Sequence, residues 1–146
     1  MDEQKFNLER FIKAQKDDYA IALSEIKQGR KSSHWIWYIS PQLDGLGRST
    51  QARYYSISGL DEAVAYYHHP ILGARLKEIS TALLELETDD SVKVLGKIDA
   101  LKLKSSMTLF NYAAPHEDIY QKVLDKFYAG EKDTATLKLL CHFSEK

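Results

Sequence analysis

The chain has 146 residues, of which 44% are hydrophobic and 28% are charged, and it carries a formal net charge of −1 at pH 7. This length and apolar content suffice for a self-contained core, so we expect residues 1–146 to form a single domain and exclude a disordered chain. The near-neutral charge excludes a domain built as a whole to bind nucleic acid or an anionic membrane.

Cysteine usage and hydropathy bear on the compartment. Cys141 is the single cysteine and cannot form an internal disulfide, which fits a reducing environment. No apolar stretch approaches the ~18 residues of a membrane-spanning helix, and the N-terminal segment lacks the pattern of a secretory leader. We therefore expect a cytoplasmic protein.

Two amphipathic helices are predicted at the start of the chain. Asn7 can cap the first helix, and Gln15 falls on its apolar face. Asp17-Asp18 predicts a break and a new cap, after which a second helix runs to about Ile26 and is ended by Gly29. We expect the Gln15 amide to be buried and to satisfy a backbone group, in preference to contacting a ligand.

Residues 35–39 (Trp-Ile-Trp-Tyr-Ile) are five consecutive large apolar side chains, and Pro41 stops the run. The residue types favour a strand. However, no other segment is a convincing strand, and a lone strand cannot satisfy its backbone groups. A short helix keeps its hydrogen bonds internal, so we predict a short buried helix here, at the centre of the molecule.

Helical patterns with caps continue to the end of the chain. Ser49 or Thr50 caps a helix to about residue 56, and Asp61 starts another. Pro70 suits the first position of the helix that follows it. Further helices are predicted over residues 72–86, 91–95, 99–113 with Asp99 as cap, and 119–130, and a last one after Asp133. The sequence thus predicts a compact, all-α, multihelical domain of seven to nine helices.

Three polar clusters are candidates for a ligand site. One precedes the buried run, one is the glycine loop 45–49, and one lies in the predicted helix 99–113. Residues 27–53 contain five basic residues and one acidic residue, a local charge of +4 that indicates an anion site. We predict ligand-binding residues at Arg30, Lys31, Ser33, His34, Trp35, Gln42, Gly47, Arg48, Ser49, Arg75, Lys102 and Ser105. We expect them to line one pocket beside Trp35 and Trp37.

Each cluster also has a purely structural explanation. The glycine loop can bind an anion through its backbone amides or can be a tight turn between helices, with Arg48 paired to Asp44. Lys102 can lie on a solvated face, and Ser105 can bond to the preceding helical turn. Serine and threonine are mediocre helix formers, however, so their presence in an otherwise apolar helix favours a pocket wall.

His34 is the candidate for acid–base catalysis. The alternative is a histidine with one ring nitrogen bound to a carbonyl group. The adjacent Ser33 does not supply triad geometry, and no orienting carboxylate can be assigned, so an enzymatic activity is not defined. His68-His69 point in different directions and Cys141-His142 lacks the spacing of a zinc site, so we predict no metal and no cofactor.

Long motifs follow one another along nearly the whole chain. They are Phe11 with Ala14-Gln15, GRKSSHWIW at 29–37, Pro41-Gln42, LGRS at 46–49, HPILG at 69–73 with Arg75-Leu76, and KLKSSMTLF at 102–110. These motifs resemble a bacterial family catalogued as domain of unknown function (DUF) 1810, whose members are sometimes labelled calpastatin. The resemblance implies a multihelical fold with a short buried central helix but no activity. The calpastatin label does not fit, because calpain inhibitors are disordered repeats that fold on their target.

A looser similarity links the early Ala14-Gln15 and the basic, serine-bearing helix to small helical domains proposed to process NAD and ADP-ribose derivatives. It implies a nucleotide-derived ligand. We therefore weigh three functions: a site for an anionic small molecule, a non-catalytic protein-interaction module, and nucleic-acid binding. The first is favoured by the local charge, the second by the lack of a catalytic set, and the third is disfavoured by the overall charge. We expect no nucleic-acid partner and no membrane partner.

Overall fold

Nine helices form the regular structure of residues 5–144, the part of the chain that the computed structural model describes, with side chains described as far as residue 141. They are α2 (Glu9–Lys27), α3 (Ile36–Ile39), α4 (Thr50–Tyr54), α5 (Leu60–His68), α6 (Leu72–Leu84), α7 (Ser91–Leu95), α8 (Lys97–Ala113), α9 (Ile119–Tyr128) and α10 (Thr134–Ser144). Among these residues the β pairing is limited to an isolated parallel bridge between Leu43 and Ile57. The predicted all-α fold is confirmed.

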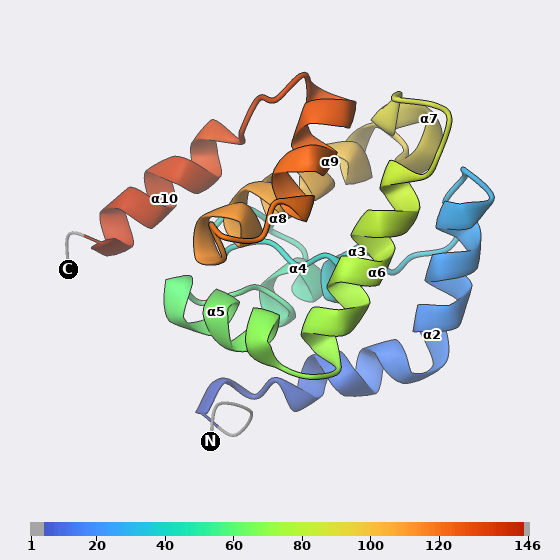
Figure 1. The fold of residues 1–146 in the computed structure, drawn as a ribbon. Helices are drawn as coiled ribbons and strands as arrows, with labels where there is room; N and C mark the ends of the chain where they lie inside the picture. Colours follow the sequence, from blue (N-terminus) through green and yellow to red (C-terminus); the bar gives the residue numbers. More distant parts are fainter. Residues whose placement is uncertain (1–4, 145–146) are drawn as a thin grey trace.

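The short helix α3 lies in the middle of the molecule, where α2 and α8 contact it (Figure 1). Ile36, Tyr38 and Ile39 are buried. The amide of Ile39 donates to the carbonyl oxygen of Trp35 at 3.2 Å, so the segment satisfies backbone groups internally. Gln15 is buried and donates to the carbonyl oxygen of Tyr38 at 2.6 Å, which confirms its predicted structural role.

Helix α2 is uninterrupted over 19 residues, and the break predicted at Asp17-Asp18 is wrong. Phe11, Gln15, Ala22 and Ile26 are all buried. Their spacing keeps one face of the helix directed inward on both sides of the two aspartates. Asp17 is exposed and Asp18 accepts a hydrogen bond from the Tyr38 hydroxyl, and neither ends a helix whose apolar stripe continues in phase.

A serine cap and an aspartate cap agree with the sequence prediction, whereas the helix starts predicted at Asn7 and Asp99 do not. The Ser49 hydroxyl accepts from the Ala52 amide at 3.1 Å at the start of α4, and Asp133 caps α10. Asn7 has a positive φ of 54° and lies one residue before Leu8, the N-cap of α2. Helix α8 begins at Lys97, two residues before the predicted cap Asp99.

The side chain of His69 closes the turn before α6, whose N-cap is Ile71, so the prediction that Pro70 occupies the first position of this helix is corrected. Nδ1 of His69 accepts from the backbone amides of Ile71 and Leu72 at 3.1 and 3.3 Å. Helix α6 therefore begins at Leu72.

Helices α5 and α6 approach each other closely at Gly73. A Cβ atom at this position would lie 2.0 Å from the carbonyl oxygen of Tyr67, which is a backbone atom and cannot turn away. The two helices are joined by the short turn at residues 69–71, so neither can retreat independently. Only glycine is compatible with this packing.

We expect Gly73→Ala to lower the free energy of unfolding by about 3 kcal/mol, because the helices must separate to admit the methyl group. Gly59→Ala is the matched control, since a Cβ at Gly59 meets no atom within 4 Å. Its expected change is below about 1 kcal/mol. Urea denaturation of both variants measures the difference. Equal effects of the two substitutions contradict the close-packing explanation.

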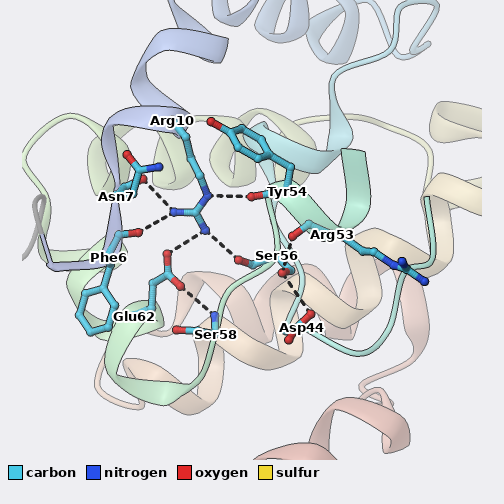
Figure 2. Close-up of polar contacts among 9 residues, drawn as sticks. All are labelled: Phe6, Asn7, Arg10, Asp44, Arg53, Tyr54, Ser56, Ser58 and Glu62. Atoms are coloured by element: carbon cyan, nitrogen blue, oxygen red, sulfur yellow. Dashed lines mark hydrogen bonds and ion pairs between the residues drawn. The ribbon is translucent and has the colours of Figure 1, made fainter. Parts of the chain in front are cut away.

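Arg10 joins three parts of the chain through all five of its guanidinium N–H groups (Figure 2). Its side chain is 8% exposed and forms an ion pair with Glu62, whose side chain is 3% exposed, at 2.9 Å. The other four N–H groups donate to the carbonyl oxygens of Phe6, Asn7, Tyr54 and Ser56 at 2.7–2.8 Å. The second oxygen of Glu62 accepts from the Ser58 amide at 2.8 Å. This buried network fixes the start of α2 and the loop after α4 against α5.

Candidate functional site

The segment before α3 is organised by a carboxylate that the sequence analysis did not identify. One oxygen of Glu25, in α2, accepts from the amides of Ser32 and Ser33 and from Nε1 of Trp35 at 2.9–3.0 Å. The other oxygen accepts from the Ser32 and Ser33 hydroxyl groups at 3.1 and 2.5 Å. Five donors thus converge on one side chain and set the path of residues 32–35. The signal for Glu25 in the sequence is its position on the face of the helix that carries the apolar residues Ala22 and Ile26.

These bonds also determine the acid–base properties of Glu25. Burial disfavours the ionised form, but hydrogen bonds from Ser33, Trp35 and the amides of residues 32 and 33 outweigh that effect and lower the pKa to about 2. A carboxylate this weakly basic does not activate the serine hydroxyl groups that donate to it. Ser33 and Glu25 therefore form a structural pair and not a nucleophile with its base.

A hollow of about 520 Å³ opens between this segment and the start of α8. Its lining residues come from the segment before α3, from α3 itself, from the end of α7 and from the first turns of α8. They are Lys31, Ser32, Ser33, His34, Trp37, Leu95, Gly96, Lys97, Ile98, Asp99 and Lys102. The hollow therefore joins residues that lie about seventy positions apart in the sequence.

Three lysines and one aspartate set the charge of the hollow. Lys31 pairs with Asp99 at 2.7 Å and donates to the carbonyl oxygen of Ser33, and its side chain is 6% exposed. Lys102 lies 3.8 Å from the other oxygen of Asp99. Lys97 is exposed, and its side chain has no ion pair or hydrogen bond among the described residues. The hollow has a net positive charge, because one carboxylate faces three ammonium groups.

His34 borders the hollow with an exposed imidazole. Its backbone carbonyl oxygen accepts from the Tyr38 hydroxyl at 3.2 Å, whereas the ring has no hydrogen-bond partner in the described part of the chain. A general base is normally held in one orientation by a second group. The ring of His34 lacks such an orienting partner here, so the lining offers cations and hydroxyl groups but no assembled catalytic set.

The first and third predicted clusters meet in the hollow only in part. Lys31, Ser33, His34 and Lys102 line it, as expected. Arg30 is exposed, and its amide donates to the Glu25 carbonyl oxygen at the end of α2. Trp35 is buried beneath the segment, with its indole N–H on Glu25 and the Lys31 ammonium 4.9 Å from its ring. Trp35 is therefore not part of the lining, contrary to the prediction.

The glycine-loop cluster does not line this hollow. A Cβ at Gly47 would lie 2.4 Å from the Cβ of Ala52, so this glycine permits close packing of the loop on α4. Ser49 caps α4, and the backbone carbonyl oxygen of Gln42 accepts from the Ile57 amide at 2.8 Å. Arg48 is exposed and has no ion pair with a described residue. The structural explanation of this loop as a tight connection accounts for these contacts.

Ser105 and Arg75 likewise have structural partners away from the hollow. The Ser105 hydroxyl bonds to the carbonyl oxygen of Leu101 and to Asp133 at 3.2 and 3.1 Å, and Thr108 accepts from the Asp133 amide at 2.9 Å. The hydroxyl-rich face of α8 thus anchors the start of α10. Arg75 donates to Gln15 at 3.2 Å and joins α6 to α2. The expectation that all three clusters line one pocket is corrected accordingly.

Two further sequence predictions concern metals and membranes. Among the residues whose side chains are described, no three histidine, cysteine, aspartate or glutamate side chains are grouped as a metal site requires. None of the helices in the described part of the chain has the length and apolar character needed to cross a bilayer.

The fold and the hollow define an all-α protein in which longer helices enclose one short buried helix beside a basic hollow. The chain belongs to the family described as "Protein of unknown function (DUF1810)", whose model matches residues 5–140. It is similar to the crystal structure of the conserved hypothetical protein Rv1873 from Mycobacterium tuberculosis, at 41% sequence identity and a TM-score of 0.92 over 94% of this chain and 98% of that one. No curated protein matches it. The resemblance stated from the sequence is confirmed.

Proposed function

We propose that the hollow binds a small anionic molecule that carries a phosphate group, with nucleotide derivatives as the first class to test. The observation that carries this proposal is the excess of cations over the single carboxylate. Lys31 already neutralises Asp99 at 2.7 Å, which leaves the charges of Lys97 and Lys102 available to a ligand. Phosphate groups are commonly held by such charge-assisted hydrogen bonds.

The local backbone supports the same class of ligand. Helix α8 has 17 residues, and its N-cap Gly96 provides no side-chain acceptor for the first amides of the helix. A Cβ at Gly96 would meet no atom within 4 Å, so the approach to these amides is open. An anion held by Lys97 and Lys102 therefore also lies near the positive end of the α8 dipole.

We expect phosphate, pyrophosphate, AMP or ADP-ribose at about 1 mM to raise the Tm, and calorimetry to give a Kd no weaker than the millimolar range. The double variant Lys97→Ala/Lys102→Ala is expected to lower the affinity for the tightest-binding of these anions by at least about tenfold, because it removes both available cations. The double variant Lys27→Ala/Lys138→Ala is the matched control, since these exposed lysines do not line the hollow.

Two outcomes contradict an anion site. In the first, none of the four anions changes the Tm. In the second, the control variant loses as much affinity as the Lys97→Ala/Lys102→Ala variant. The second result means that binding is a diffuse effect of surface charge, which also falls steeply with added salt.

A protein-interaction role is the second candidate, and one observation favours it. Ile98 and Leu101 are neighbours on one side of α8 and are 69% and 62% exposed. Adjacent exposed apolar side chains are typical of interaction surfaces. If this role is correct, the anions have no effect on Tm, and Ile98→Ser together with Leu101→Ser reduces association with a partner protein or a second copy.

A further inference from the structure

The lining of the hollow contains two chemically different kinds of side chain. Lys97 and Lys102 contribute ammonium groups. Trp37, Leu95 and Ile98 contribute apolar surface. A simple inorganic anion would contact only the ammonium groups, so the apolar residues require an explanation of their own.

Packing in the protein core does not account for all of these apolar residues. Trp37 packs against the core but is only half-buried, whereas its neighbours in α3 are buried. Ile98 is 69% exposed in the first turn of α8, where a polar residue forms a helix equally well. Apolar and aromatic side chains that border a hollow are the usual contacts of the apolar part of a ligand.

Lys102 covers Trp37 in the structure, but only weak contacts hold it there. Its ammonium group lies 5.0 Å from the centre of the Trp37 ring and 3.8 Å from the nearer Asp99 oxygen. The stronger bond of Asp99, at 2.7 Å, is to Lys31. Contacts of this kind at a partly exposed side chain contribute little, so Lys102 can turn toward a bound anion and uncover the indole.

We infer that the ligand of this hollow is an aromatic anion, whose charged group binds Lys97 and Lys102 while its planar ring packs on Trp37 and Ile98 in place of the Lys102 ammonium. This inference rests on the proposed anion site and specifies its second half. The chemistry is that of a flat ring joined to a phosphate, and both aryl phosphates and nucleoside monophosphates have it.

Phenyl phosphate and methyl phosphate form a matched pair of probes, because they carry the same charged group and differ only in the ring. With the full chain, calorimetry is expected to show that phenyl phosphate binds about tenfold more tightly. AMP and ribose 5-phosphate form a second, larger pair, in which AMP carries the ring and is expected to bind more tightly. Binding of phenyl phosphate is also expected to change the tryptophan emission, and Trp37→Leu is expected to abolish both the change and the preference.

Ile98→Ser provides a test that does not endanger the fold, since this side chain is largely exposed. It is expected to lower the affinity for phenyl phosphate severalfold and to leave that for methyl phosphate unchanged. Leu101→Ser is its matched control, because Leu101 is almost as exposed but does not line the hollow. This control is expected to change neither affinity.

The results separate the two proposals. If both probes bind with equal affinity and neither Trp37→Leu nor Ile98→Ser changes the ratio, the anion site stands and the inference about the ring is wrong. If neither probe nor inorganic phosphate binds, the anion site itself is wrong and the inference falls with it.

Discussion

Replacing Arg10 with alanine is expected to lower the free energy of unfolding by about 3–5 kcal/mol, the range for removing one partner of a buried ion pair. The substitution leaves the Glu62 carboxylate in the interior with only the Ser58 amide as a donor. It also leaves four backbone carbonyl oxygens without the guanidinium group that they share. The bonds to Phe6 and Ser56 are partly buried, so their loss adds to the cost.

Urea denaturation at pH 7 measures this effect, and two further variants establish its cause. Arg10→Lys keeps the charge but cannot reproduce five bonds in a plane, so we expect it to retain only part of the stability. Lys77→Ala removes a cation whose side chain is 48% exposed and whose pair with Glu117 is 2.8 Å long, and its expected cost is below about 1 kcal/mol. A loss for Arg10→Ala as small as that for Lys77→Ala contradicts the role of a buried network.

Replacing Glu25 with glutamine is expected to lower the free energy of unfolding by about 3 kcal/mol at pH 7. The amide group of glutamine offers one acceptor oxygen in place of two, and its NH₂ group faces the hydroxyl groups of Ser32 and Ser33. The magnitude follows from the pKa of Glu25, which is lowered from 4.5 to about 2 in the folded protein. A difference of this size corresponds to about 3 kcal/mol in favour of the ionised folded state.

The contribution of Glu25 depends on pH in a defined direction. Because its pKa is lower in the folded chain than in the unfolded chain, its contribution is complete above about pH 5 and is lost as the pH falls from 4.5 toward 2. The difference between wild type and Glu25→Gln is therefore expected to shrink over this window. Urea denaturation at pH 7, 5, 4 and 3 tests it, with the exposed Glu87→Gln as control. A difference that stays constant with pH means that packing, and not charge, explains the loss.

The fold was predictable from the sequence wherever apolar spacing or a common cap carried the information. The run at 35–39 was identified as a buried helix because no second strand was available to pair with it. Ser49 or Thr50 and Asp133 were predicted as caps from residue type and position, and Ser49 and Asp133 each accept from an amide three residues further on. The error at Asp17-Asp18 arose because two local patterns disagree there. Asp17-Asp18 has the composition of a cap, but the apolar face of α2 continues through it.

The candidate site was predictable only in part, for a related reason. Lys31 and His34 were identified as polar residues next to the aromatic run, and Lys102 as part of the lysine and serine cluster in the helix predicted over 99–113. Arg10 and Glu62, which belong to the fold and not to the candidate site, were missed for the same reason, because they are 52 residues apart and each by itself has the character of an ordinary surface charge. Buried charges are distinguished by their partners, and partners distant in sequence cannot be assigned from one chain alone.

The double role of the segment before α3 has a consequence for protein engineering. Ser32 and Ser33 form a wall of the hollow and also donate to Glu25, so randomising them would mix changes in recognition with misfolding. Lys97 and Ile98 project from the first turn of α8 and are both exposed, so they can be varied without such losses. A combinatorial library that tests the proposed anion site is therefore best confined to the α8 side of the opening.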